Sequence, residues 1–350
     1  MLNGKATPEG TARYTSRFPA LRAAGFYREA GGRHLSNLGL GTYLGDLNDE
    51  TDRAYAEAVL GAVRGGINVI DTAINYRHQR SERSIGLALA ELQELEEIQR
   101  AEFLVCTKAG FLVPEAIPAH VLQDNDVVGG MHSMAPAFLA DQIGRSLENL
   151  GLDTIDVFYL HNPETQLGFV TREEFLARVR LAFELLEQMV AEGKIAGYGT
   201  ATWEGYRKPG ALQLPELREI AKGIAGDQHN FRWIQLPFNL GMTEAFTLKT
   251  QREGERSLTV LEAAEEAEVT VVASASLLQA RLASNLPEEL AQRLAGASTD
   301  AQRAIQFTRS TPGVTTALVG MSRTEHVEEN LGVASFSPLS PEAYQALYRG

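Results

Sequence analysis

Short apolar runs alternate with longer amphipathic segments along nearly the whole chain, and this alternation most constrains the fold. Eight runs have the length and the apolar, often β-branched content of buried strands. These runs cover residues 35–39, 67–71, 103–107, 155–160, 195–199, 232–236, 269–273 and 315–319.

The segments between these runs carry apolar residues at helical spacing, and several begin or end at typical helix-boundary residues. The predicted helices cover residues 52–64, 81–98, 136–150, 172–192, 214–223, 257–267, 299–311 and 324–331. Eight strands alternating with about eight helices predict parallel βα units and therefore the α/β class.

Parallel βα units form either an open, doubly wound sheet or a closed barrel. An open sheet that binds a dinucleotide needs three glycines in the turn after its first strand. Here Gly39 and Gly41 are followed by Thr42, Tyr43 and Leu44, so the third glycine is missing. We therefore expect a closed (β/α)8 barrel, a fold that commonly forms one domain of this length.

Two segments do not fit the regular alternation. Residues 1–24 are polar and are expected to be a mobile or surface-lying N-terminal extension, which leaves 25–350 as the barrel domain. Residues 112–133 are too long for an ordinary βα loop and form an insertion after the third barrel strand. In a barrel this insertion lies at the carboxyl ends of the strands, where substrates bind.

Composition excludes several classes of partner. The net charge of −13 argues against a nucleic-acid surface and against an anionic membrane. No run of apolar residues is long enough to span a membrane, and the N-terminus lacks the apolar core of a secretory signal. Cys106 is the single cysteine, so no intrachain disulfide forms. We expect a cytoplasmic protein, and the oligomeric state stays open.

Four polar residues follow predicted strands, where a barrel would bring their side chains together. Asp71, Lys108 and His161 close three strands, and Tyr76 lies five residues beyond Asp71. A lysine beside a tyrosine favours the phenolate, and an aspartate holds the lysine as a cation. A histidine can donate a hydrogen bond to the carbonyl oxygen of a substrate. This set suits hydride transfer, in which a developing alkoxide is protonated.

With these residues the sequence resembles the aldo-keto reductase superfamily between about residues 25 and 334. Asp71 to Tyr76 together with Ser81 and Glu82 resemble the family signature D-T-A-x-x-Y-G-x-G-x-S-E. The resemblance implies a single-domain TIM barrel, with Asp71, Tyr76, Lys108 and His161 as the catalytic residues.

A second matching block lies near the C-terminus and reads V-G-M-S-R-T-E-H-V-E-E-N over residues 319–330. It resembles the segment with which the family binds the phosphates and adenosine of NADP(H). The glycine entering a helix suits an anion, and Arg323 suits the 2′-phosphate. NAD(H) is the less favoured cofactor. The residues that the resemblance implies here are Gly320, Ser322, Arg323, His326, Glu329 and Asn330.

Further cofactor positions follow from the resemblance, with departures. Gly41, Thr42 and Asp71 line the nicotinamide end, and Thr202 and Gln235 match carboxamide ligands, although Ala201 replaces a usual serine. Ser274 and Leu277 stand where relatives read Y-S-P-L, so a stacking ring is absent, and Trp203 or Phe238 are candidates to replace it. Arg77 and Gln79 replace the two signature glycines, which changes the shape or charge of the rim.

The sequence thus predicts an NADP(H)-dependent enzyme that interconverts a small-molecule carbonyl compound and an alcohol, with no metal ion. The alternative is a nucleotide-binding partner protein or redox-sensing protein of the same fold with little turnover, as the altered carboxamide and stacking positions would allow. The identity of the substrate and the physiological direction of the reaction stay open.

Overall fold

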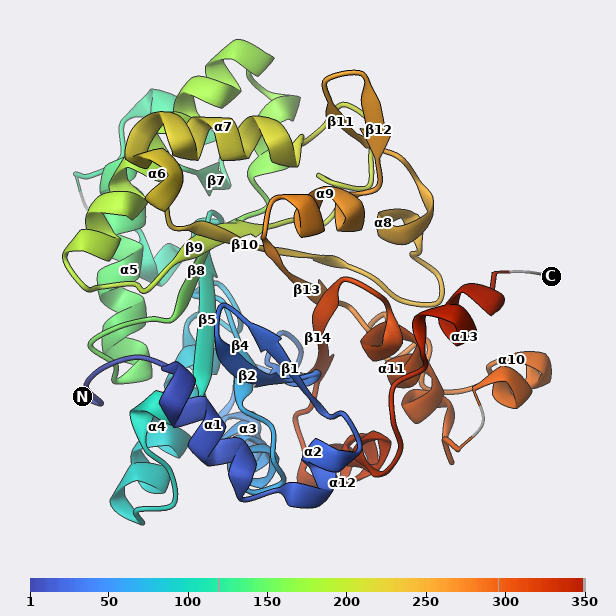
Figure 1. The fold of residues 1–350 in the computed structure, drawn as a ribbon. Coiled ribbons are helices and arrows are strands. Elements are labelled where there is room, and N and C mark those ends of the chain that lie inside the picture. Colours follow the sequence, from blue (N-terminus) through green and yellow to red (C-terminus); the bar gives the residue numbers. More distant parts are fainter. Residues whose placement is uncertain (119, 295, 349–350) are drawn as a thin grey trace.

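The computed structural model describes residues 1–118, 120–294 and 296–348, and its centre is a closed barrel of eight parallel strands. The strands follow one another around the barrel in the order β3, β4, β5, β8, β9, β10, β13 and β14, and β14 pairs with β3 to close it. Helices surround the strands in Figure 1. The predicted (β/α)8 barrel is confirmed.

The barrel strands are β3 (Leu38–Gly41), β4 (Val69–Asp71), β5 (Leu104–Ala109), β8 (Val157–His161), β9 (Tyr198–Ala201), β10 (Phe231–Pro237), β13 (Thr270–Ser274) and β14 (Val314–Gly320). The helices that follow them in turn are α3 (Asp49–Arg64), α4 (Arg80–Glu94), α5 (Pro136–Leu150), α6 (Arg172–Ala191), α7 (Leu214–Ala225), α9 (Val260–Glu266), α11 (Asp300–Ser310) and α12 (Thr324–Leu331). Shorter helices are α1 (Pro8–Ser16), α2 (Pro19–Ala23), α8 (Glu244–Thr247), α10 (Glu288–Arg293) and α13 (Pro341–Ala346).

The strand predicted over 35–39 is wrong as a single element. Its first residues belong to β2 (Arg33–Ser36), which pairs antiparallel with β1 (Tyr27–Ala30) outside the barrel, and β3 begins at Leu38. Asn37 separates the two strands and donates from its side chain to the Gly25 carbonyl, 3.0 Å away. Leu35 and Leu38 are apolar and buried on either side of the break, so hydrophobicity alone does not mark it.

The helix predicted over 257–267 begins three residues later than expected. Residues Arg256–Leu258 form β12, which pairs with β11 (Gln251–Glu253), and the helix starts at Val260. Thr259 caps it by accepting from the Glu262 amide, while the Glu262 carboxylate accepts from the Thr259 amide. This reciprocal pair fixes the first turn of α9.

Two apolar cores lie on either side of the barrel wall. The larger core lies between strands and helices, and the smaller one fills the barrel with side chains such as Val69, Leu104 and Tyr159. Ala6, Ala30 and Leu35 from the N-terminal segment and the β1–β2 hairpin join this inner core. They close the amino-terminal end of the barrel, so a ligand enters from the carboxyl end.

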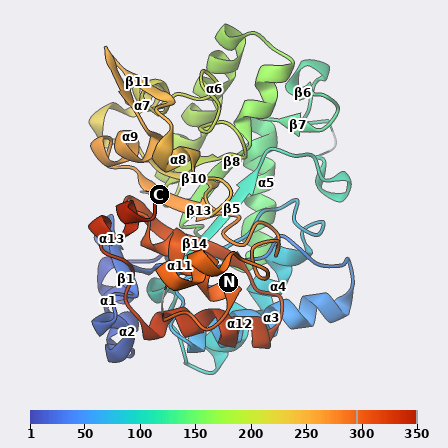
Figure 2. The same ribbon diagram turned by 90° about the vertical axis from the view of Figure 1, so that its right-hand side faces the viewer.

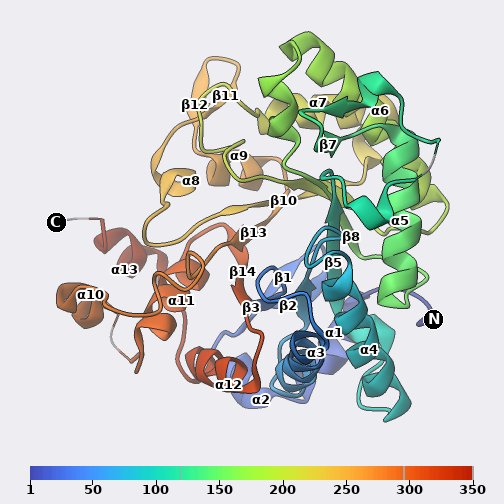
Figure 3. The ribbon, with the colours of Figure 1, turned by 180° about the vertical axis from the view of Figure 1, so that it is seen from behind.

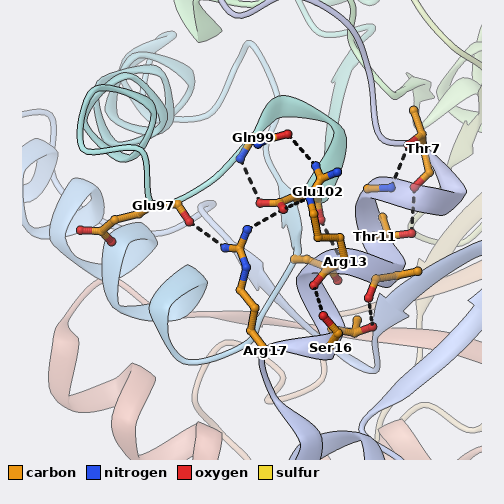
Figure 4. Close-up of polar contacts among 12 residues, drawn as sticks. Thr7, Thr11, Arg13, Ser16, Arg17, Glu97, Gln99 and Glu102 are labelled. Carbon is orange, nitrogen blue, oxygen red and sulfur yellow. Dashed lines mark hydrogen bonds and ion pairs between the residues drawn. The ribbon is translucent and has the colours of Figure 1, made fainter.

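The first 24 residues pack against the barrel instead of extending from it. In Figure 4 the Glu102 carboxylate lies between the guanidinium groups of Arg13 in α1 and Arg17 directly after it, with N–O distances of 2.7 and 2.5 Å. Tyr14 is fully buried and donates to the Val63 carbonyl, 2.5 Å away. These contacts attach the segment to the barrel domain. In the described part of the chain, no helix combines the length and apolarity needed to cross a membrane.

The predicted insertion ends in a small hairpin. Strands β6 (Val127–Val128) and β7 (His132–Ser133) pair antiparallel; Figure 2 shows both near α6, and Figure 3 shows β7 near the same helix. The Ser133 amide donates to the Gly110 carbonyl, 2.8 Å away, and the Leu112 amide donates to the Met131 carbonyl, 2.8 Å away. The insertion therefore folds back onto the end of β5.

Candidate active site

The four polar residues predicted to converge do lie together at the carboxyl ends of neighbouring strands. Asp71 ends β4, Lys108 lies near the end of β5, and His161 ends β8, while Tyr76 comes from the loop after β4. Asp71, Tyr76 and His161 line a cavity of about 620 Å³, and the Lys108 side chain is buried beside them.

Asp71 and Lys108 form a buried ion pair. Lys108 Nζ lies 2.6 Å from Asp71 Oδ2 and donates to the Thr72 carbonyl, also 2.6 Å away. Burial lowers the pKa of Lys108, but the negative charge of Asp71, together with the interaction with Tyr76, more than offsets this and raises it. Lys108 therefore remains a cation although its side chain is only 1% exposed.

The Tyr76 ring lies between this ammonium group and the cavity. Lys108 Nζ is 5.0 Å from the ring centroid, and the rings of Tyr43 and His161 contact Tyr76 edge-on at 5.0 and 5.8 Å. Burial raises the pKa of Tyr76, and Lys108 offsets only part of this. The phenol therefore keeps its proton at neutral pH, which suits a group that donates a proton.

His161 is a neutral imidazole. Burial and the neighbouring positive charge of Lys108 lower the pKa of His161 well below its usual value. Its Nδ1 atom is buried and has no hydrogen-bond partner among the described residues. The neutral ring keeps one N–H donor, which a carbonyl oxygen in the cavity would accept.

The predicted nicotinamide end is lined by Gly41, Thr42, Thr202, Gln235, Ser274 and Leu277. Gln235 Nε2 donates to Asp71 Oδ1, 2.7 Å away, so this amide also orients the aspartate. Thr202 Oγ1 is buried without a partner among the described residues. A buried hydroxyl without a partner fits a bound polar group such as a carboxamide.

Glu164 holds the loop that carries Thr202. Its Oε1 atom accepts from the amides of Trp203, Glu204 and Gly205 at 2.8, 3.0 and 3.1 Å. Because Glu164 is three residues beyond His161, this contact ties the loop after β9 to the end of β8.

The predicted adenosine block lies after β14 and is only partly at the cavity. Gly320, Ser322 and His326 line it. Arg323 precedes α12 and is exposed, as is Glu329, whereas Asn330 is buried. Arg323, Glu329 and Asn330 do not line the cavity.

Arg77 and Gln79 adopt the backbone that the replaced glycines would favour. The φ angles of Arg77, His78 and Gln79 are 49°, 51° and 71°. Such a conformation costs a residue with a side chain about 1–2 kcal/mol. Arg77 pairs with Asp52, 2.6 Å away, and donates to the Asp46 carbonyl. Its charge is therefore neutralised by Asp52, and Arg77 does not line the cavity.

Other lining residues lie next to strand ends and were not singled out in the sequence as cavity residues. They include Tyr43 after Thr42, Phe111 shortly after Lys108, and Asn162 directly after His161. The rule that strand-end residues converge could have found them. Of the two candidate replacements for the stacking ring, Trp203 lines the cavity, whereas Phe238 is buried and stacks on Phe307.

A closed barrel that gathers these four side chains at one end is the arrangement that the resemblance to the aldo-keto reductases predicted. The sequence model of the aldo/keto reductase family matches residues 37–208, which hold all four side chains. Over these residues the chain is therefore similar to the aldo/keto reductase family.

Two curated relatives and one solved structure extend this finding. The chain is 33% identical over 189 residues to D-threo-aldose 1-dehydrogenase of Pseudomonas, covering 52% of each chain. It is 24% identical over 336 residues to a putative voltage-gated potassium channel subunit beta of Schizosaccharomyces pombe, covering 89% of this chain and 88% of that protein.

The solved structure is an aldo/keto reductase from Klebsiella pneumoniae in complex with NADP and acetate. It superposes with a TM-score of 0.63 at 20% identity and covers 91% of this chain and 92% of its own. The chain thus spans about half the length of the aldose dehydrogenase, while the fold extends over nearly the whole solved structure.

Proposed function

We propose that the protein is an NADP(H)-dependent oxidoreductase that interconverts a carbonyl compound and an alcohol. The observation that carries this proposal is the placement of Tyr76 and His161 around one cavity, with Lys108 beside the Tyr76 ring and held by Asp71. The family match over 37–208 and the NADP complex of the Klebsiella structure support it.

Each side chain has a distinct role in this proposal. His161 donates a hydrogen bond to the substrate carbonyl oxygen and orients it. Tyr76 gives its proton to that oxygen as negative charge develops on it, and takes a proton in the reverse direction. Lys108 limits the rise in the pKa of Tyr76, and Asp71 keeps Lys108 charged and in place.

The cofactor site is proposed along the same cavity. Thr202, Gln235 and Ser274 would hold the carboxamide end near Gly41 and Thr42, with Leu277 beside them. Gly320, Ser322, Arg323 and His326 would hold the phosphates, and Glu329 and Asn330 would lie toward the adenine. A bound nicotinamide supplies or accepts the hydride. The unpartnered Thr202 hydroxyl fits a polar ligand at this end.

Replacement of Tyr76 by Phe tests the chemistry. We expect NADPH oxidation with methylglyoxal or para-nitrobenzaldehyde to fall by at least about 100-fold, because proton transfer contributes roughly 10²–10⁴-fold to such reactions. NADPH binding, measured by fluorescence quenching, should be retained. Wild-type protein that turns over none of a wide panel of aldehydes, ketones and sugars would contradict the proposal.

The likeness to the channel subunit over most of the chain favours a second candidate, a nucleotide-binding protein that acts through a partner. This candidate expects tight nucleotide binding and a slow turnover that Tyr76→Phe leaves unchanged. A large loss of activity in that variant would exclude it.

A further inference from the structure

The insertion over 112–133 reaches the active site through one buried histidine. His132 lies in β7 and forms a bridge with Phe111, two residues beyond the end of β5. His132 is fully buried, although Ile117 and Met131 of the same insertion are exposed.

Both ring nitrogens of His132 have partners. Nε2 lies 2.8 Å from the backbone carbonyl of His161, and Nδ1 lies 2.9 Å from Gln166 Nε2. A carbonyl only accepts and an amide nitrogen only donates, so the proton is on Nε2 and Nδ1 accepts. The remaining oxygen of Gln166 accepts from Arg178 of α6, 2.7 Å away, which fixes the orientation of the amide.

His132 also contacts the His161 side chain indirectly. The Phe111 ring meets the His132 ring edge-on at 5.2 Å and the His161 ring edge-on at 5.1 Å. Phe111 and His161 line the cavity, whereas His132 does not. His132 therefore supports both the backbone carbonyl and the ring of the residue proposed to orient the substrate.

Gly110 leaves the space that this contact needs. A Cβ atom at this position would lie 2.5 Å from the His161 carbonyl oxygen and 2.7 Å from His132 Nε2. Any side chain there would push the donor and the acceptor apart.

We propose that His132 is a positioning residue, through which the insertion holds His161 in its orientation toward the cavity. The inference rests on the proposed role of His161 in carbonyl reduction, and it gives the insertion a function. The hydrogen-bond chain Arg178–Gln166–His132–His161 links α6 to the end of β8.

The test compares His132→Phe, which keeps an aromatic ring, with His132→Gln, whose amide can donate in place of Nε2. With methylglyoxal and NADPH we expect kcat of His132→Phe to fall roughly 10- to 100-fold, because small displacements of a reacting group cost this much. The Kd for NADPH should not change, and His132→Gln should recover most of the kcat. His120→Asn, an exposed position in the same insertion, is the matched control.

Nitrogen NMR of the His161 imidazole gives a readout that does not depend on turnover. Its signals should shift in His132→Phe and return toward the wild-type position in His132→Gln. Unchanged His161 signals in a folded His132→Phe protein would overturn the proposal, as would an unchanged kcat. If the wild-type protein reduces no carbonyl probe, the proposed function fails, and the NMR comparison still decides whether His132 positions His161.

Discussion

At the scale of single residues, burial sets the ionisation of the side chains around the cavity. Tyr76 stays protonated and His161 stays neutral because both side chains are buried away from water, which disfavours their charged forms. Lys108 stays charged because the Asp71 carboxylate is 2.6 Å from it. The sequence predicted that Lys108 favours the phenolate. Lys108 does lower the pKa of Tyr76, as expected. The effect of burial is larger than that of Lys108, so the pKa of Tyr76 is raised overall.

The buried histidines make stability depend on pH. Burial lowers the pKa of His132 to about 4 and that of His161 well below its usual value. Between about pH 6.5 and 4 the unfolded chain therefore binds more protons at these sites, so stability falls as pH falls, by up to about 1.4 kcal/mol per pH unit for each histidine.

Chemical denaturation of the wild type and of His132→Gln over this pH range measures the effect. The variant should lose stability less steeply with acid, and the difference in slope isolates His132. Glu82 and Glu164 act in the opposite sense in both proteins, because burial raises their pKa. Parallel curves for the two proteins would contradict the prediction.

At the scale of elements, local capping and tertiary contact decide different boundaries. Thr171 caps α6 and Thr259 caps α9, and both helices begin where these side chains accept from backbone amides. The break between β2 and β3 has no such local signal. It depends on Asn37 and on the pairing of β3 with β4 and β14, which are distant in sequence.

The attachment of α1 through Glu102 is testable by Glu102→Gln. The Glu102 side chain has no exposed surface and accepts from Arg13, Arg17 and the Gln99 amide. Removing its charge should destabilise the protein by about 1–3 kcal/mol, the usual cost of an impaired buried hydrogen-bonding group.

In Glu102→Gln, the rate of amide hydrogen exchange relative to the wild type should increase most in α1. Glu94→Gln, at an exposed position of the neighbouring helix α4, is the matched control and should change little. Equal exchange of the α1 amides in the wild type and in Glu102→Gln would show that the apolar contacts of Tyr14 alone hold the segment.

At the scale of the whole molecule, the closed barrel places residues from all parts of the chain around one cavity. Gly41 and His326 both line it, although they are 285 residues apart (326 − 41). The amino-terminal end is closed by Ala6, Ala30 and Leu35, so the carboxyl end is the open one. This geometry connects the proposed nicotinamide and phosphate ends of the cofactor site.

A cofactor bound along this cavity should stabilise the entire fold, because it binds the native chain and not the unfolded one. At a hundredfold excess over Kd the stabilisation is about 2.7 kcal/mol, which should appear as a higher Tm. NADPH should raise the Tm more than NADH at equal concentration, and Arg323→Ala should remove this difference. Equal shifts with both nucleotides would contradict the assignment of Arg323 to the 2′-phosphate.

The sequence by itself determined the class of fold, the approximate position of each barrel element and the four strand-end residues. Periodicity reports which faces are buried, and strand ends of a parallel barrel necessarily converge. Only the tertiary structure decided the rest. It showed that Arg77 is paired and does not line the cavity, that residues 1–24 pack on the barrel, and that His132 contacts His161. Each of these depends on contacts between distant segments, for which a local sequence pattern carries no signal.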